Sequence, residues 1–441
     1  MRADSYDPRG CPDIHVEHYD LDLTYKLAGN RLSGTAVLRV TALTDLQQLE
    51  VDLTGLTVKK VTLSGARLAK YAHRGGRLQL RLAAEVPEGA TFEVTVRYDG
   101  HPVPVPSPWG TVGWEELTDG ALVASQPTGA SSWFPCNDRP ADRSTYRTAV
   151  TTDNDYHVLA HGTLVERRAR AATTTWVYEE RHPTAAYLAT VQIGRYVELP
   201  LADAPVAQRA LVPAQLRRPA AQLLARHGEM MSTLAELFGP YPFTAYTLVF
   251  TEDELEIPVE AQGISVFGAN HVEPSGGDER LVPHELAHQW FGNSVSVATW
   301  QHIWLNEGFA CYAEWLWSPH AGGRGTDAMA RHWHAVLARG PQDLVLADPG
   351  PANIFDDRIY KRGALTLHAL RLTVGDAGFF ALVRDWSARY RYRSVTTADF
   401  RALALQHAEI GGGEALAGTV GALLTAWLDQ PRLPALPPLP L

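Results

Sequence analysis

The sequence predicts an α+β protein of more than one domain, in which an all-β N-terminal half precedes a mainly helical half with one small sheet. Two observations predict this order. Residues from about 12 to 200 form alternating apolar and polar segments separated by turn residues, whereas segments after Leu281 have the apolar spacing of helices. The chain has 441 residues, enough for two or three domains, and we predict domains at 1–200 and 201–441.

Several segments of the first half alternate at the period of a β-strand. Ile14–Tyr25 alternates with a slight irregularity, and Leu78–Leu82 and Phe92–Tyr98 alternate cleanly. Turns are expected at Gly29-Asn30, Gly75-Gly76 and Asp119-Gly120. Residues 101–108 hold too many prolines for a central strand, so we expect a surface loop there.

The pattern of the sequence changes near residue 200, where the second half begins. Leu199–Pro213 holds several alanines and prolines and is the expected domain junction. Arg218–Phe238 has helical spacing, and Gly239 should end that helix. Tyr246–Phe250 and Ile264–Phe267 are expected as short strands, the latter at a sheet edge. Further helical segments are expected near residues 325–338, 357–374, 376–390, 397–408 and 414–429.

Composition excludes several classes of protein. With 45% hydrophobic and 20% charged residues, the chain resembles ordinary soluble globular proteins. A net charge of −10 argues against a nucleic-acid partner. Cys11, Cys136 and Cys311 form no disulfide framework by spacing. Because we find neither an apolar leader nor a membrane-spanning run, we expect no membrane association and a cytoplasmic location.

A catalytic metal site is predicted between residues 284 and 307. His284 and His288 lie four residues apart and would share one face of a helix, with Glu285 beside them. Eighteen residues separate His288 from Glu307, which leaves room for a second helix to bring Glu307 in as a third ligand. A bare His-Glu-x-x-His also arises by chance. Three ligands and one open position predict one catalytic Zn²⁺ per chain, with Glu285 as general base.

The stretch His-Glu-Leu-Ala-His-Gln-Trp-Phe-Gly-Asn at 284–293, followed by Trp-Leu-Asn-Glu-Gly-Phe-Ala at 304–310, resembles the gluzincin aminopeptidases related to aminopeptidase N and leukotriene hydrolase. The resemblance covers most of the chain. It implies a saddle-like N-terminal β domain and a thermolysin-like, mainly helical catalytic domain. Larger members carry a further helical C-terminal domain, and this chain stops short of it, so we expect a more open cleft.

The resemblance also implies residues that bind the substrate. Glu260 matches the glutamate of the family pattern Gly-x-Met-Glu-Asn, which grips a free amino terminus, and Gly263 follows as in the family. Ile257, Val259 and Ala261 replace the Gly, Met and Asn of that pattern. A solvated loop carboxylate is the alternative for Glu260. Gln126 resembles a family position that lines the pocket for the first residue.

Tyr360 stands in Tyr-Lys-Arg-Gly-Ala, which is similar to the family's Tyr-x-Lys-Gly-Ala. In the family this hydroxyl meets the oxyanion of the tetrahedral intermediate, a role that suits a preorganised donor; an ordinary helix tyrosine is the alternative. Glu314, seven residues past Glu307, is a candidate partner for a ligand histidine. Pro283 predicts that the helix carrying His284 and His288 either begins near Leu281–Pro283 or is kinked there. Cys136, in a stretch that resembles a family landmark, is expected to be buried packing.

Three functions are weighed. The leading one is a zinc aminopeptidase acting on peptides or other small amine-bearing substrates. The second is a hydrolase of an epoxide or a specialised amide on the same scaffold, which the altered residues around Glu260 motivate. A panel of amino-acid anilides distinguishes these two. The third is a non-catalytic binding module, which elemental analysis for zinc would distinguish. The sequence leaves the oligomeric state and the preferred first residue open.

Overall fold

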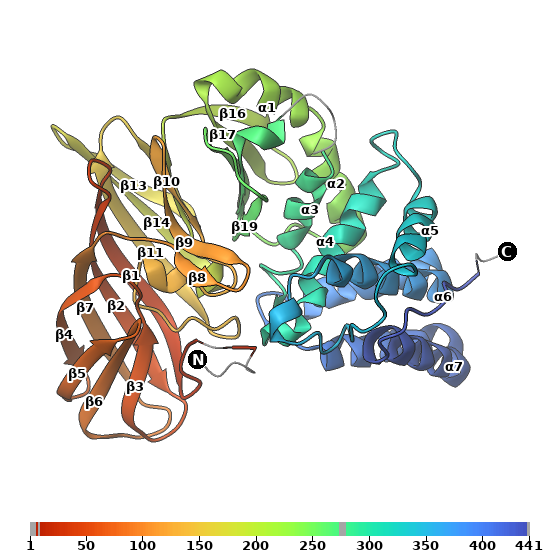
Figure 1. Ribbon diagram of the computed structural model, residues 1–441, viewed down its shortest axis with the longest axis horizontal. Helices are drawn as coiled ribbons and strands as arrows, with labels where there is room; N and C mark the ends of the chain where they lie inside the picture. The colour runs from red at the N-terminus through yellow and green to blue at the C-terminus, as the bar shows by residue number, and fades with distance from the viewer. Residues whose placement is uncertain (1–5, 8, 273–278, 439–441) are drawn as a thin grey trace.

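The computed structural model describes residues 6–7, 9–272 and 279–438. A β-rich N-terminal half lies beside a mainly helical C-terminal half (Figure 1). The predicted α+β order is therefore confirmed.

The largest sheet of the N-terminal half has seven strands in the order β13-β14-β11-β1-β2-β7-β4. These strands are β1 (Ile14–Lys26), β2 (Arg31–Ala42), β4 (Thr57–Ser64), β7 (Thr91–Gly100), β11 (Arg143–Asp153), β13 (Thr163–Ala169) and β14 (Thr173–Ala185). The pairing of β1 with β2 shifts register between Val16 and His18, where the sequence pattern is irregular. Buried apolar residues otherwise alternate along β1, because one face of the sheet covers the core.

Two smaller sheets complete this half. The first has the order β3-β6-β5, and its strands are β3 (Leu46–Asp52), β5 (Leu68–Arg74) and β6 (Arg77–Val86). The second has the order β12-β15-β10-β9-β8. Its strands are β8 (Val105–Ser107), β9 (Gly110–Leu117), β10 (Gly120–Ala124), β12 (His157–Ala160) and β15 (Val191–Gly194). The prediction of a loop over residues 101–108 is wrong for Val105–Ser107. Strand β8 lies at a sheet edge, where a proline costs no central hydrogen bond.

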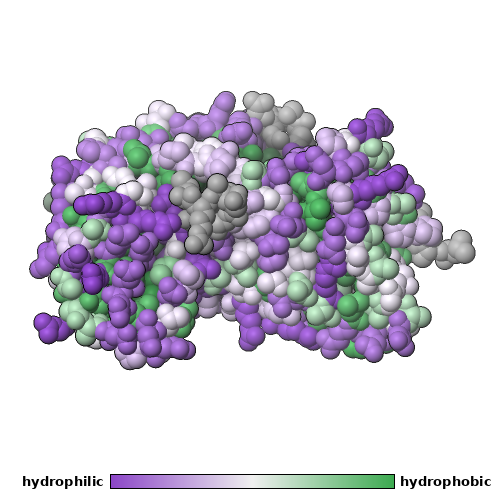
Figure 2. All heavy atoms as spheres, turned by 60° about the horizontal axis from the view of Figure 1, so that its bottom comes forward, coloured by the Kyte–Doolittle hydropathy of each residue, from purple (hydrophilic) through white to green (hydrophobic). Residues whose placement is uncertain are grey.

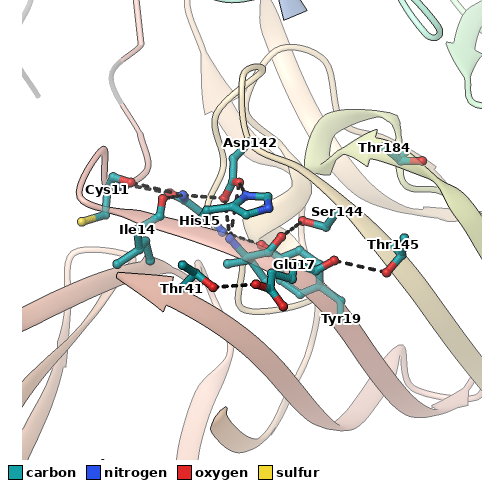
Figure 3. A network of polar contacts seen from close by, with 12 residues as sticks. Cys11, Ile14, His15, Glu17, Tyr19, Thr41, Asp142, Ser144, Thr145 and Thr184 are labelled. Atoms are coloured by element: carbon teal, nitrogen blue, oxygen red, sulfur yellow. Dashed lines mark hydrogen bonds and ion pairs between the residues drawn. The ribbon is translucent and has the colours of Figure 1, made fainter. Parts of the chain in front are cut away.

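A buried polar network ties the start of β1 to β11 (Figure 3). The Asn137 side chain donates to Asp142 Oδ2 at 2.6 Å and to the carbonyls of Cys11 and Ile14 at 3.2 and 3.3 Å. The Asp142 carboxylate also bonds the His15 ring and raises its pKa. The expected packing role of the stretch around residues 133–138 agrees with this network, and the nearby Cys136 is fully buried.

A mixed sheet of five strands opens the C-terminal half, in the order β16-β17-β18-β20-β19. Its strands are β16 (Tyr196–Ala202), β17 (Ala207–Pro213), β18 (Ala245–Phe250), β19 (Val259–Ala261) and β20 (Ile264–Phe267). One prediction is wrong here. The segment Leu199–Pro213, which is expected as the domain junction, contains parts of β16 and β17, and these two strands pair with each other. Strand β20 is not at the edge: it is buried and paired on both sides, and the edge is the three-residue β19.

The mixed sheet lies between the two hydrophobic cores. Val249 and Val266 belong to the core of the β-rich half, whereas Leu248 and Phe267 belong to the helical core. This division follows from the alternation of side chains along a strand. Edge strand β19, which carries Glu260, consequently lies where the two halves meet.

Helices form the rest of the chain: α1 (Arg217–Leu223), α2 (His227–Phe238), α3 (Leu281–His288), α4 (Trp304–Trp317), α5 (Thr326–Leu337), α6 (Asp357–Arg389) and α7 (Thr397–Asp429). Two-residue strands β21 (Ser296–Val297) and β22 (Ser394–Val395) pair between them. The single helix predicted for 218–238 is interrupted between α1 and α2. Gly375 and Gly413, with φ of 73° and 69°, break α6 and α7 where the sequence predicts gaps between helical segments.

Polar residues dominate the face of the molecule shown in Figure 2, and apolar residues there form small separate groups. Among the described helices, none combines the length and the apolar character that crossing a membrane requires.

Helices α4 and α6 approach each other closely at two glycines. A Cβ on Gly363 would lie 2.7 Å from the Cα of Gly308. We therefore expect Gly363→Ala to lower the free energy of unfolding by about 1–3 kcal/mol, because the helix backbones must separate. Urea unfolding monitored by circular dichroism measures this. Gly378→Ala in the same helix is the control, since its Cβ would lie an ordinary 3.5 Å from Val374; equal losses in both variants would contradict the explanation.

Candidate metal centre

Two helices bring the three predicted ligands together. His284 and His288 lie on α3, and Glu307 lies in the first turn of α4. Glu307 Oε2 is 3.7 Å from His284 Nε2 and 3.4 Å from His288 Nε2. All three side chains are buried, and their ligand-capable atoms lie within 4.8 Å of one another. The arrangement predicted from the spacing of these residues is thus present in the fold.

The local sequence explains how α3 forms and ends. The helix begins at Leu281, as predicted, so Pro283 lies in its first turn, where an unpaired backbone nitrogen costs nothing. After His288 the chain turns tightly: Asn293 N donates to the His288 carbonyl at 2.9 Å. Gly292 has φ of 126°, which favours glycine at this turn. The turn directs the chain back toward α4 and so allows Glu307 to reach the histidines.

Each of the two predicted ligand histidines has a partner for its second ring nitrogen. His284 Nδ1 lies 2.8 Å from Glu314 Oε1, and His288 Nδ1 lies 3.1 Å from the Phe291 carbonyl. These contacts orient both Nε2 atoms toward Glu307, as ring partners commonly do at zinc sites. The partnership of Glu314 agrees with the sequence interpretation. The Phe291 carbonyl was missed, because a backbone contact leaves no signal in the sequence.

The charges at this cluster are strongly coupled. Burial lowers the pKa of His284, but bonds to Glu307 and Glu314 outweigh it and raise the pKa to about 9. Burial also opposes the charge of His288, yet Glu307 and Glu260 raise its pKa to about 10. The histidines in turn outweigh burial at Glu307 and lower its pKa to about 2. Protons and a divalent cation therefore compete for this site.

The Glu285 carboxylate lies beside the cluster, where it could accept a proton. Its side chain is buried, and its Oε2 has no hydrogen-bond partner within the described residues. Burial raises the pKa of Glu285 to about 7, although the positive charges of His284 and His288 oppose the shift. A carboxylate that titrates near neutrality matches the requirement for a general base.

Glu260 projects from β19 toward the same cluster. One ligand-capable atom each of Glu260, Glu285 and His288 lies within 4.8 Å of the others, and within the described residues no further such group exists besides this one and the triad. Gln126 of the β-rich half donates to Glu260 Oε1 at 2.6 Å. Gly263, with φ of 75°, forms the turn from β19 to β20. Because Glu260 is only 7% exposed, the alternative of a solvated loop carboxylate is wrong.

Tyr360 lies in the first turn of α6, next to the predicted metal ligand His284. Its ring is nearly parallel to that of His284, with 6.2 Å between the centroids. Burial and the nearby Glu307, Glu260 and Glu285 carboxylates raise its pKa well above its usual range. The hydroxyl is therefore protonated at neutral pH and can donate a hydrogen bond.

The residues of this cluster fit a zinc ion. Two imidazole nitrogens and one carboxylate oxygen converge, and this donor set is typical of catalytic zinc sites that keep a fourth position open. The oriented Nε2 atoms and the neighbouring Glu285 agree with that requirement.

Comparisons with known proteins agree with the geometry. The family description "Peptidase family M1 domain" matches residues 225–427, and "Peptidase M1 N-terminal domain" matches residues 119–188. A crystal structure of an M1 zinc metallopeptidase from Deinococcus radiodurans superposes with a TM-score of 0.87 at 30% identity and covers 99% of both chains. The chain belongs to the M1 family of zinc metallopeptidases. Its cofactor is Zn²⁺, as the sequence predicts.

Other relatives of this M1 peptidase are longer. Aminopeptidase B of Mus musculus is 25% identical over 96% of this chain and 70% of its own length. Aminopeptidase RNPEPL1 of Mus musculus is 27% identical over 76% of this chain. The match spans 48% of that relative, about half of its length. A mutant of the Deinococcus protein has been solved bound to Tyr-ser-ala, and a mutant two-domain M1 zinc metallopeptidase has been solved bound to L-arginine.

The two domain matches lie on either side of the predicted boundary between 1–200 and 201–441. The change from the β-rich sheets to the mixed sheet occurs slightly earlier, at Arg195 between β15 and β16. The boundary itself stays a prediction.

Proposed function

We propose that this M1 peptidase is an aminopeptidase that uses zinc to remove the N-terminal residue from peptides. The buried carboxylate of Glu260 beside the triad of His284, His288 and Glu307 is the observation that carries the proposal. A buried carboxylate needs a partner of opposite charge, and a peptide's terminal ammonium supplies one. The peptide bound to the Deinococcus mutant supports this class of ligand.

Substrate binding begins at the amino terminus. The Glu260 carboxylate accepts hydrogen bonds from the ammonium, and the Gln126 amide fixes the orientation of that carboxylate through its 2.6 Å bond. Gly263 lies in the backbone turn that follows β19. The contact between Glu260 and the ammonium places the first peptide carbonyl of the substrate, and no later one, at the metal centre.

The chemical step uses groups from three helices. His284, His288 and Glu307 would hold zinc, which supplies Lewis acidity that activates water and polarises the carbonyl. Glu285 takes the proton of the attacking water and passes it to the leaving amine. The Tyr360 hydroxyl donates to the carbonyl oxygen as its negative charge develops.

A charge-neutral substitution tests the proposal. We expect Glu260→Gln to lower kcat/KM for leucine 4-nitroanilide by about 10- to 100-fold, because a charged hydrogen bond to the ammonium is lost. Hydrolysis of the N-acetylated anilide should change little. Glu256→Gln, which changes an exposed carboxylate in the segment leading into β19, is the matched control. Full activity of Glu260→Gln on free-amino substrates would remove the exopeptidase argument.

The alternative of an epoxide or specialised amide hydrolase is not favoured. Two of the named relatives are called aminopeptidases, and Glu260 lies beside the triad despite the changed residues around it. A zinc-loaded protein that cleaved no amino-acid anilide would reverse this preference.

We also propose a cytoplasmic location. Cys11, Cys136 and Cys311 are all free and buried, as is common in proteins of reducing compartments. Measuring the location of the natural protein by cell fractionation tests this.

A further inference from the structure

Two fully buried side-chain amides join the end of the zinc helix to the strand that carries Glu260. Gln289 follows His288 directly, and its Nε2 donates to the Ala261 carbonyl at 3.1 Å. The Gly263 N–H donates to Gln289 Oε1 at 2.8 Å. Asn293 Nδ2 donates to the same Ala261 carbonyl at 2.8 Å. Both amides are 0% exposed, so water does not compete for these bonds.

The strand held by these amides is short and lies at the edge of its sheet. Strand β19 has three residues and is hydrogen-bonded to β20 on one side only. Ala261, directly after Glu260, has no polar side chain with which to anchor itself. Gln289 and Asn293 add two hydrogen bonds to the Ala261 carbonyl of β19, and Gln289 adds a third to the turn that follows.

We propose that Gln289, assisted by Asn293, is a positioning residue that sets the distance between the amine-binding carboxylate of Glu260 and the metal centre. The inference rests on the proposed aminopeptidase function. An aminopeptidase must hold the ammonium one residue away from the carbonyl that is attacked. Because Gln289 is adjacent to the ligand His288, its bonds to Ala261 and Gly263 transmit the position of α3 directly to β19.

Two different contacts thus fix Glu260. Gln126 orients the side-chain carboxylate from the β-rich half, whereas Gln289 fixes the backbone at Ala261 and in the turn that follows it. The Gln289 side chain bonds backbone atoms that follow Glu260 in the chain. Gln289 therefore acts on the substrate only indirectly, by positioning Glu260. A displacement of about 1 Å at such a site can cost about 100-fold in rate.

The test compares Gln289→Met alone and combined with Glu260→Gln. With leucine 4-nitroanilide, we expect Gln289→Met to lower kcat/KM by about tenfold or more and to reduce the preference for the free amine over the N-acetylated substrate. One zinc per chain should remain. In the Glu260→Gln background, the same substitution should cost little more, because the charge that it positions is already absent.

A neighbouring substitution controls for general damage to this segment. Trp290 is buried, and its indole Nε1 donates to the Gly239 carbonyl at 2.9 Å, away from β19. Trp290→Phe should therefore keep the preference for the free amine. If Gln289→Met fails to fold, Asn293→Ala removes one of the three bonds and should show a smaller change of the same kind.

Three outcomes would overturn the inference. Gln289→Met could lower kcat/KM by the same factor in the wild-type and Glu260→Gln backgrounds, or it could lose its zinc. If Gln289→Met does not fold, an unchanged preference for the free amine in Asn293→Ala would be the third. Failure of the proposed function looks different. In that case the wild-type protein itself would not distinguish the free amine from the acetylated substrate.

Discussion

Replacing Glu285 with glutamine is expected to lower kcat by about 10²–10⁴-fold, the contribution typical of a positioned general base. The substitution keeps the shape of the side chain but removes its ability to accept a full proton. Because Glu285 is buried with one oxygen unpartnered among the described residues, a neutral amide should not disturb the histidines beside it. Steady-state kinetics with an amino-acid anilide, at equal zinc occupancy, measures the effect.

The expected loss for Glu285→Gln is confined to the chemical step. KM and the zinc content should stay close to those of the wild-type protein, since Glu285 is proposed neither as a ligand nor as the amine-binding group. Glu409→Gln, at an exposed position on α7, controls for a change of one charge. Retention of wild-type kcat by Glu285→Gln would show that another group accepts the proton.

Glu307→Gln should abolish activity by removing the metal. An amide is a poor ligand for zinc, and only His284 and His288 would remain to bind it. We expect zinc to fall from about one per chain to near zero after dialysis, as measured by elemental analysis, in line with three protein ligands at such sites. The substitution also removes the negative charge that lies beside two buried imidazoles. Thermal unfolding should therefore be measured to confirm that the variant is folded.

Glu314→Gln gives the graded comparison for Glu307→Gln. Glu314 bonds His284 Nδ1 at 2.8 Å and would not contact the ion itself. Its substitution should weaken zinc affinity by about 10- to 100-fold, a cost typical of losing a ligand's partner. Wild-type zinc content in Glu307→Gln would contradict the assignment of the third ligand.

Much of this site could be predicted because its residues follow helical periodicity. His284 and His288 are four residues apart, and Glu307 and Glu314 are seven apart on α4, so each pair shares a helix face. Pro283 marks the start of α3 through its missing N–H. Glu260, Gln126 and Tyr360 depended on resemblance to a family, since no periodicity connects them to the helices.

The features that could not be predicted depend on contacts between distant segments. Strand β19 is too short to show alternation, so the neighbouring β20 was taken for the edge. The bonds of Gln289 and Asn293 to the Ala261 carbonyl join residues about thirty positions apart through backbone atoms, which carry no residue-type signal. The prolines and alanines of Leu199–Pro213 gave no sign of a strand, although β16 and β17 pair there. Whether such a segment forms a strand depends on its cross-strand partners, which the local sequence does not show.

The most direct measurement of the central claim is an anomalous-scattering map from crystals of the zinc-loaded protein, recorded at the zinc absorption edge. The account predicts one peak, about 2.0–2.2 Å from His284 Nε2, His288 Nε2 and a carboxylate oxygen of Glu307. A peak coordinated by other residues, or no peak in protein that hydrolyses amino-acid anilides, would contradict it.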